Sequence, residues 1–425
     1  MTMNLTSYWT DHYPRPVDLP VATDLPAETD VAIIGGGYTG LSAARTIAKN
    51  GTSAVVLERE TIGWGASSRN AGITGCSLKQ KTTTIFKWYG EEYGRTFWEA
   101  SLDALVLIKE LVYEEGIDCD WQQHGDLCVF VKPSHYDSDP AWKRWHEEKL
   151  GHNLDLIAPA DLRDEIGSDA YYGGVVDEHG AGLHPAKLVF GMAEVAAKYG
   201  AQLFEKAGVI GIEKLPQGYL VHTARGSFRA KEVIVATNGY TDGVVPGLRS
   251  KVIPVGSYSI VTEPLPEDLQ RELSPQGRMF WDSKWFLSYF RLTPDGRMLW
   301  GGRNNLSTTL DLVASAEILR KEMVRAFPQL CDVSITHSWT GQLGLPFDLM
   351  PHIGQIDGIH YALGYGGHGL HTAIYLGREV AQIIIGEKAS SPFAEIPHRS
   401  YFFYRNQPWF MPLAVIYYRI KDWLS

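Results

Sequence analysis

A glycine-rich segment near the start of the chain has the residue types and the spacing of a phosphate-binding turn. Gly35-Gly36-Gly37-Tyr38-Thr39-Gly40 matches the pattern GxGxxG. The apolar run at 31–34 predicts a buried strand before it, and the apolar spacing after it predicts a helix. Gly35 would allow the tight turn, Gly37 would let the backbone approach a pyrophosphate, and Gly40 would let the helix pack closely on the sheet. The N-terminus of that helix would then offer N–H groups to the phosphates.

A carboxylate completes this pattern. Glu58 follows the next predicted strand, at 54–57, where it can accept both hydroxyls of a ribose. Strand, turn, helix and acid together predict a dinucleotide site, and the alternative is a glycine-rich turn followed by an ordinary surface glutamate. The pattern does not separate NAD from FAD. An acid at Glu58 disfavours NADP, because a 2′-phosphate there would meet like charge.

Five further segments, in this order, resemble one family of flavoenzymes. They are RETIGWGASSRNAG at 59–72, LSYFRLTPDGRMLWGG at 287–302, WTG at 339–341, MPHIG at 350–354 and GYGGHG at 364–369. Together they resemble the FAD enzymes of the D-amino acid oxidase superfamily, and within it the chain is most similar to the gamma-glutamylputrescine oxidases. The resemblance extends over nearly the whole chain, and the later segments are more specific than the first glycine motif.

The resemblance implies an FAD-dependent oxidation of an amine. Such flavins take a hydride equivalent from the carbon beside a neutral amine, giving an imine that water hydrolyses. The implied partners are a small-molecule amine, with a gamma-glutamylated amine of polyamine breakdown as first candidate, and O2 or another electron acceptor. An oxidase is favoured over a dehydrogenase. Secondary amines, glycine and D-amino acids stay open as substrates, and so does a nucleotide-binding module without redox turnover.

The resemblance also assigns the contacts to FAD. Small residues at 65–68 would let the backbone lie along a pyrophosphate or the flavin edge. Arg69 and Asn70 would lie beside the isoalloxazine, or else anchor their own loop. The glycines at 366–369 precede a predicted helix whose N-terminal N–H groups would meet the flavin O2. The predicted contacts are Gly35, Gly37, Tyr38, Thr39, Gly40, Glu58, Arg59, Gly65, Ala66, Ser67, Ser68, Arg69, Asn70, Ala71, Val209, Ala236, Thr237, Gly366, Gly367, His368, Gly369 and Leu370.

Several positions depart from the pattern of the relatives. Ser68 and Ala71 each replace a glycine of GASGRNGG, which adds bulk beside the flavin. Relatives that resemble glycine oxidase carry an arginine just after the Trp-x-Gly, whereas 342–345 reads QLGL here. The missing cation argues against a simple α-amino acid as substrate. Trp339 stands in the region of a cysteine that links to FAD in other relatives, and 59–72 contains no histidine, so we expect non-covalent FAD.

The residues that would meet the substrate are harder to assign, because the cofactor carries the chemistry and no catalytic triad is needed. If 286–292 is a strand, Leu287, Tyr289 and Arg291 share one face. Tyr289 would contribute an aromatic wall against a cationic amine, and Arg291 would hold a distal carboxylate. His368 lies in the predicted flavin loop. Further wall candidates are Trp281, Trp285 and Trp339. The alternatives are a core tyrosine, core tryptophans, a surface arginine and a structural histidine.

The elements that must position these residues combine two kinds of sheet. Strand patterns at 31–34, 54–57 and 233–236 are of the buried parallel type, whereas 251–262 and 285–301 look antiparallel. This predicts an α/β fold: a Rossmann-like FAD-binding domain built from discontinuous segments, with an inserted antiparallel-sheet substrate domain, as in D-amino acid oxidase. The predicted segments are an N-terminal arm at 1–28, the FAD-binding domain at 29–90, 150–245 and 331–390, the substrate domain at 91–149 and 246–330, and an aromatic C-terminal tail at 391–425.

Composition excludes several other classes of protein. The 425 residues include 39 Lys and Arg against 49 Asp and Glu, a net charge of -10, which argues against a nucleic-acid partner. The 4 cysteines form no CxxC pair, so we expect no metal site, and they suit a reducing cytoplasm. No secretory signal and no run of membrane-span length stands out in the sequence. The C-terminal tail would cover the fold or form an oligomer contact.

Overall fold

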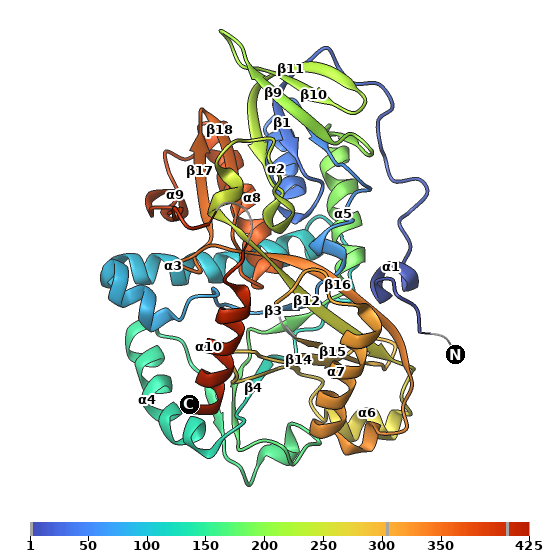
Figure 1. Cartoon of the computed structure of the whole chain (residues 1–425), viewed down its shortest axis with the longest axis vertical. Coiled ribbons are helices and arrows are strands. Elements are labelled where there is room, and N and C mark those ends of the chain that lie inside the picture. Colours follow the sequence, from blue (N-terminus) through green and yellow to red (C-terminus); the bar gives the residue numbers. More distant parts are fainter. Residues whose placement is uncertain (1–2, 303–305, 405–407, 425) are drawn as a thin grey trace.

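The computed structural model describes residues 3–302, 306–404 and 408–424, which form two eight-stranded sheets, a small third sheet and surrounding helices (Figure 1). The α-helices are α1 (Tyr8–His12), α2 (Tyr38–Lys49), α3 (Thr82–Tyr113), α4 (Pro133–Leu150), α5 (Pro185–Lys198), α6 (Glu267–Leu273), α7 (Leu312–Ala326), α8 (Gly369–Ile384), α9 (Pro392–Glu395) and α10 (Met411–Leu424). The strands are β1 (Glu28–Ile34), β2 (Ala54–Leu57), β3 (Ile73–Thr74), β4 (Asp126–Val129), β5 (Asp155–Ile157), β6 (Gly174–Asp177), β7 (Ala181–Gly182), β8 (Gln202–Phe204), β9 (Val209–Lys214), β10 (Tyr219–Thr223), β11 (Gly226–Val235), β12 (Ile253–Thr262), β13 (Met279–Asp282), β14 (Tyr289–Leu292), β15 (Met298–Gly302), β16 (Ile335–Leu345), β17 (His352–Ile356) and β18 (Ile359–Leu363).

The first sheet has a parallel core. Its order is β17-β18-β11-β1-β2-β8, with β9 and β10 attached to β11, and the strands from β18 to β8 run parallel. Apolar residues fill both faces of β1 and β2, as a sheet covered on both sides requires, and these strands are almost wholly buried. Helix α2 packs against both α8 and α5 beside this sheet (Figure 1). The predicted Rossmann-like architecture is confirmed.

The second sheet is mainly antiparallel and lies below the first in Figure 1. Its strand order is β16-β12-β15-β14-β13-β4-β6-β5, and within the described part of this sheet only β13 and β4 pair in parallel. A tight turn at Asp295 and Gly296 joins β14 to β15, as the sequence signal predicts. The predicted antiparallel insertion is therefore confirmed.

Three strands, β5, β6 and β16, belong to a different sheet from the one that the predicted domain segments imply. These strands fall in segments predicted for the FAD-binding domain, but they hydrogen-bond in the second sheet, β6 beside β4 and β16 beside β12. A strand carries no local mark of the sheet that it joins, since long-range register decides its partners. The two-domain division stays a prediction, with these strands moved to the second sheet.

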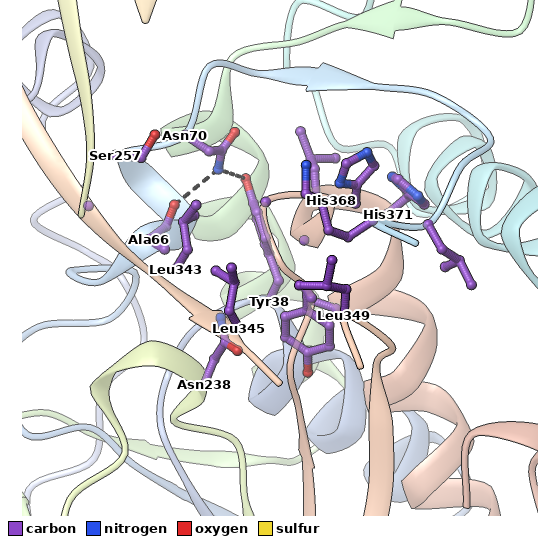
Figure 2. Close-up of a pocket in the computed structure, with 18 of the residues that line it drawn as sticks. Tyr38, Ala66, Asn70, Asn238, Ser257, Leu343, Leu345, Leu349, His368 and His371 are labelled. Carbon is purple, nitrogen blue, oxygen red and sulfur yellow. Dashed lines mark hydrogen bonds between the residues drawn. The ribbon is translucent and has the colours of Figure 1, made fainter. Parts of the chain in front are cut away.

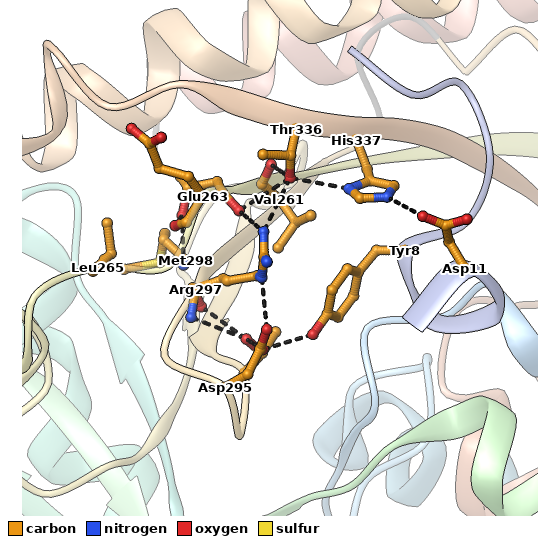
Figure 3. A network of polar contacts seen from close by, with 12 residues as sticks. Tyr8, Asp11, Val261, Glu263, Leu265, Asp295, Arg297, Met298, Thr336 and His337 are labelled. Atoms are coloured by element: carbon orange, nitrogen blue, oxygen red, sulfur yellow. Dashed lines mark hydrogen bonds and ion pairs between the residues drawn. The ribbon is translucent and has the colours of Figure 1, made fainter. Parts of the chain in front are cut away.

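The N-terminal arm begins with a short helix fixed against the second sheet. The hydroxyl of Tyr8 donates to Asp295 Oδ1 at 2.6 Å, and Arg297 Nε lies 2.6 Å from the other oxygen of that carboxylate (Figure 3). One turn later in α1, Asp11 Oδ2 lies 3.0 Å from His337 Nε2. Polar partners in the β14–β15 turn and on β16 therefore hold the start of the arm as part of the folded body.

The C-terminal tail ends in helix α10, which packs on the loop between β13 and β14. The carboxylate of Asp422 accepts hydrogen bonds from the backbone N–H groups of Trp285 and Phe286, at 2.6 and 3.1 Å. Lys132 Nζ donates to the carbonyl oxygens of Asp422 and Trp423 at the C-terminal end of the helix. The tail thus covers the fold, one of the two predicted alternatives. Within the described residues, no helix is both long enough and apolar enough to cross a bilayer.

Candidate active site

A cavity of about 900 Å³ lies where the two sheets meet (Figure 2). Ile34, Leu57 and Val235, the last residues of three parallel strands, line it on one side. Cys128 of β4 and Tyr289 of β14 line it from the second sheet. Open parallel sheets bind ligands beyond the carboxyl ends of their strands, so this cavity is in the expected place for a nucleotide.

The glycine motif forms the turn between β1 and α2 that its spacing predicts. Gly35 has φ +111°, which L side chains rarely adopt, and a Cβ there would lie 2.8 Å from the Ala236 carbonyl oxygen. A Cβ on Gly40 would overlap the carbonyl of Gly35, so α2 can approach the turn only because Gly40 has no side chain. A Cβ on Gly37 would lie 2.8 Å from Ser67 Oγ. The turn therefore presents backbone, rather than side chains, to the cavity.

Glu58 lies on the cavity wall directly after β2. Its Oε2 accepts a hydrogen bond from the Gly36 N–H at 2.8 Å, and its Oε1 accepts one from the Glu60 N–H at 2.8 Å. These two bonds fix the carboxylate beside the glycine turn. Each carboxylate oxygen has a second lone pair, so Glu58 can still accept hydroxyl groups of a ribose.

The loop at 65–72, predicted to follow the flavin, is closed by Asn70. Its amide donates to the carbonyl oxygens of Ala66 and Ser67 at 3.1 and 3.0 Å, and its side-chain oxygen accepts from the Gly72 N–H at 2.9 Å. Figure 2 shows this amide between Ala66 and the Tyr38 hydroxyl. Asn70 therefore anchors its own loop, which is the alternative left open by the sequence, while it also lines the cavity.

Successive carbonyl groups of this loop are held from distant parts of the chain. Ser7 Oγ donates to the carbonyl oxygen of Ser68 at 2.9 Å, and Trp339 Nε1 donates to that of Arg69 at 2.9 Å. Trp9 Nε1 donates to the carbonyl oxygen of Asn70 at 2.7 Å. Trp9 and Trp339 are fully buried. Such bonds fix the backbone of the loop against the cavity. The parts played by Ser7 and Trp9 are not predicted by the sequence, because 61 residues separate each donor from its acceptor and no local pattern joins them.

The second glycine-rich segment leads into α8. His368 and Gly369 line the cavity where this helix begins, so its N-terminal end faces the cavity. The Tyr365 hydroxyl lies 2.7 Å from Thr39 Oγ1 and ties the segment to α2. His371 also lines the cavity, and burial lowers its pKa to about 4. Since the ring is then neutral at pH 7, its Nε2–H can donate to the carbonyl of Ser77, 2.9 Å away.

Tyr289 lies on the wall formed by the second sheet. Its hydroxyl shares hydrogen bonds with those of Ser257 and Ser259, at 2.9 and 3.2 Å. Trp281 and Trp285 line the same end of the cavity. The structure therefore brings together an aromatic wall at the place where the sequence predicts one, and its contact with an amine stays a prediction.

Arg291 and Trp339, which are predicted as substrate contacts, are buried away from the cavity. Arg291 is 0% exposed, and its guanidinium donates to the carbonyl oxygens of Gly72 and Leu183, at 2.7 and 3.1 Å. Trp339 directs its indole N–H to a backbone carbonyl. Neither residue lines the cavity. Strand alternation predicts which face a side chain takes, but here loop backbone covers that face, and the alternation cannot show it.

Most of the predicted cofactor contacts lie on the cavity wall. Those that do are Gly35, Gly37, Tyr38, Thr39, Glu58, Arg59, Gly65, Ala66, Ser67, Arg69, Asn70, Ala71, Val209, Ala236, Thr237, Gly367, His368, Gly369 and Leu370. Three lie off the wall: Gly40 packs under the turn, Ser68 is buried, and Gly366 lies against Lys79. The direct contacts of Ser68 and Gly366 with the cofactor stay predictions, whereas Gly40 has its predicted packing role.

The cavity suits a dinucleotide in size as well as in shape. Its volume of about 900 Å³ is near the upper end for ligand pockets, which run from roughly 300 to 1,000 Å³. Residues 30–383 match the family described as FAD dependent oxidoreductase, which is most of the chain. The chain belongs to this family. The oxidoreductase is thus FAD-dependent, and a nucleotide-binding module without turnover is not favoured.

Individual relatives agree with this assignment. The oxidoreductase is 34% identical over 400 residues to the gamma-glutamylputrescine oxidoreductase of Escherichia coli (strain K12), covering 93% of each chain. Its fold is similar to that of glycine oxidase from Geobacillus kaustophilus, with a TM-score of 0.76 at 20% identity, covering 88% of this chain and 100% of that one. L-proline dehydrogenase from P. horikoshii gives a TM-score of 0.71 at 22% identity, with 87% and 96% covered. These two structures confirm the predicted fold.

The residues on the cavity wall fit FAD. The backbone at 35–39 would hold the pyrophosphate, because a Cβ at Gly35 or Gly37 would collide with neighbouring atoms, and the fixed carboxylate of Glu58 would hold a ribose. The loop at 65–71 and the N-terminal end of α8 would lie along the isoalloxazine. Trp64, which lines the cavity beside Arg69, is a contact that the predictions omit. Its place in the family segment GWGASS is the signal that could have identified it.

Proposed function

We propose that the oxidoreductase oxidises an amine C–N bond to an imine, which water hydrolyses to an aldehyde and ammonia or a smaller amine. The observation that carries this proposal is the continuity of one cavity, from the glycine turn at Gly37 to the aromatic wall at Tyr289 and Trp281. When bound, FAD supplies the two-electron acceptance. The protein would orient the substrate, since Tyr289 is fixed by Ser257 and Ser259.

The composition of the wall favours an amine over a simple α-amino acid. Leu343 and Leu345 line the cavity from β16, in the stretch where relatives resembling glycine oxidase carry an arginine. An apolar wall offers no partner for a carboxylate at that place. Similarity to a gamma-glutamylputrescine oxidoreductase supports a gamma-glutamylated amine as first candidate. Secondary amines are the second candidate, because the same wall accepts an alkyl substituent on the nitrogen.

We further propose O2 as the electron acceptor, non-covalent FAD and a cytoplasmic location. Trp339 stands in the region where other relatives carry the linking cysteine, and the loop at 59–72 contains no histidine, which supports non-covalent binding. An oligomer contact through α10 is supported by its exposed apolar side chains, which include Leu413, Ile416 and Trp423 at 63%, 55% and 80%. Acid precipitation should release FAD into the supernatant, and flavin that stays with the pellet would contradict non-covalent binding.

An anaerobic screen tests the function. The flavin-loaded enzyme is mixed with gamma-glutamylputrescine, putrescine, sarcosine and D-amino acids, and loss of the oxidised flavin absorbance is followed. We expect bleaching by an amine that lacks an α-carboxylate beside the reacting nitrogen. Bleaching by D-amino acids alone would overturn the proposal, and so would the absence of bleaching by every amine. Admission of air then distinguishes an oxidase, which regains its colour quickly, from a dehydrogenase.

A further inference from the structure

A carboxyl group lies on the cavity wall, away from the glycine turn. Asp126 begins β4, is half-buried and lines the cavity. The indole N–H of Trp281 donates to its Oδ1 at 3.0 Å. Among the described residues, no other side chain forms a hydrogen bond or an ion pair with this carboxyl group. A carboxylate has about four acceptor sites, so most of the hydrogen-bonding capacity of Asp126 is unused in the protein itself.

Asp177, on the neighbouring strand, is a carboxylate that forms several hydrogen bonds within the protein. Asp177 pairs with Asp126 in the register of β4 and β6. It lies 2.8 Å from His152 Nε2, 3.0 Å from the Cys76 thiol and 3.0 Å from His179 Nδ1. These partners hold the pKa of Asp177 at about 2, whereas burial and the negative Asp177 raise the pKa of Asp126 to about 7. Among the described residues, Asp126 therefore has no direct positive partner, although an opposite charge nearby is what favours the ionised form of a carboxyl group.

The positive groups nearby are engaged elsewhere. Arg278, whose charge acts on Asp126, lies 2.5 Å from Glu165 and 3.0 Å from Glu178. Lys284, which lines the cavity, lies 2.8 Å from Asp282. None of these cations reaches Asp126 in the described structure. When Asp126 is ionised, a cationic ligand in the cavity would supply the positive partner that the described residues do not.

The side chains around Asp126 suit an organic cation. Trp281 is 38% exposed and lines the cavity with Phe130 and Trp142. Aromatic faces attract ammonium groups, most strongly tryptophan. Trp281 therefore both orients the carboxylate and offers a ring face beside it.

The strand register places Asp126 and Tyr289 on strands that are not neighbours in the sheet. Trp281 pairs with Cys128 on one side and with Tyr289 on the other, so β13 lies between β4 and β14. Neighbouring strands are about 4.8 Å apart, which puts β4 roughly 10 Å from β14. A ligand that contacts both Asp126 beside β4 and Tyr289 on β14 must have an extended chain between its two ends.

We propose that Asp126 and Trp281 bind a second ammonium group of the substrate, at the end of an aliphatic chain remote from the amine that is oxidised. The substrate class is then a diamine or an amine derivative with a second cationic nitrogen. This inference rests on the proposed amine oxidation. It replaces the predicted carboxylate clamp at Arg291, which is buried off the cavity.

Paired ligands test the inference. Octylamine and 1,8-diaminooctane have the same chain and differ only in the second nitrogen. We expect the wild-type holoenzyme to bind the diamine more tightly by calorimetry, and to reduce its flavin with a higher kred/Kd. Asp126→Asn should lower the affinity and the kred/Kd for the diamine by roughly thirtyfold, because it removes one partner of the charge pair. The same two quantities for the monoamine should stay within about twofold of the wild-type values.

A matched control is Asp332→Asn, which makes the same change at an exposed position away from the cavity. Trp281→Phe keeps a ring but removes the hydrogen bond, and should weaken diamine binding less than Asp126→Asn does. Equal binding of both ligands by the wild-type enzyme overturns the inference without any variant, and so does an equal loss for both ligands in Asp126→Asn. If no amine reduces the flavin, the proposed function fails, and calorimetry still decides whether Asp126 binds the second ammonium.

Discussion

Single N–H groups fix the loop that is expected to hold the isoalloxazine. The indoles of Trp9 and Trp339 donate to the carbonyls of Asn70 and Arg69, and Asn70 closes the same loop with its amide. A buried hydrogen bond that loses its donor leaves an unpaired carbonyl, which costs about 1–3 kcal/mol. At the residue scale, we therefore expect the affinity for FAD to depend also on Trp9 and Trp339, which do not line the cavity.

We predict that Trp9→Phe weakens FAD binding by roughly tenfold, because the Asn70 carbonyl loses its donor. Equilibrium titration of the apoenzyme with FAD, followed by flavin fluorescence, measures the change. Trp300→Phe is the matched control, since Trp300 is equally buried but its indole N–H has no hydrogen-bond partner in the described structure. Equal losses of affinity in the two variants would show that packing, and not the hydrogen bond, is responsible.

Tyr289 gives a second residue-scale prediction, which concerns pH. Hydride leaves readily only from a carbon beside a neutral nitrogen, and an aliphatic amine has a pKa of roughly 10.4. Anaerobic kred/Kd should therefore rise from pH 6 to pH 9 in stopped-flow measurements. Tyr289→Phe should shift the pKa of the bound amine or weaken binding, with little loss of FAD. A flat pH profile in the wild-type enzyme would count against amine oxidation, and an unchanged profile in the variant would remove Tyr289 from the site.

Local patterns predict the elements of the nucleotide fingerprint well. The structure contains the predicted strands at 31–34 and 54–57 and the helix between them. Each is predictable because an apolar run or a glycine turn is encoded within a few neighbouring residues. The substrate end is less predictable. No motif in the sequence marks Asp126, since its proposed role depends on its place on the cavity wall and on the few partners that the fold gives it. Arg291 is buried only because loops distant in the sequence cover it. The aromatic tail is predicted as a cover, but its helical form is not.

At the scale of elements, α10 closes one end of the substrate compartment. Tyr418 lines the cavity from this helix, and Asp422 binds the backbone before β14. We predict that Asp422→Asn, which weakens these hydrogen bonds, raises the substrate Kd by about fivefold, while FAD content stays unchanged. Anaerobic titration measures the Kd, and limited proteolysis should cut α10 faster in the variant. Asp332→Asn serves as the control, and equal proteolysis of the two variants would argue against this role for Asp422.

At the scale of the molecule, buried histidines couple stability to pH. Burial lowers the pKa of His184 and His371 to about 4 and that of His398 to about 3. These rings are neutral in the folded chain, whereas the unfolded chain binds protons below about pH 6.5. Their contribution to stability is therefore complete above pH 6.5 and is lost as the pH falls toward 4. Asp126 acts in the opposite direction over part of this range, because its pKa is raised to about 7.

A single variant isolates one of these contributions. His371→Gln cannot bind a proton, so the fall in unfolding free energy between pH 7 and pH 5 should shrink by about 2 kcal/mol relative to the wild-type protein. Urea unfolding of the holoenzyme at both pH values measures this difference. His124→Gln, at an exposed position, should leave the fall unchanged. The same fall in His371→Gln as in the wild type would mean that His371 does not titrate on unfolding.

The cavity is lined by residues from Ile34 to Tyr418, and this span constrains how the protein matures. Domains form from the N-terminal side first during synthesis, so the first strand, turn and helix can fold early on the ribosome. The loop at 65–72 still lacks Trp339, and the end of the cavity still lacks α8 and α10, until almost the whole chain has been made. Cofactor capture is therefore a post-translational event. A cell short of riboflavin would accumulate full-length apoprotein rather than stalled fragments.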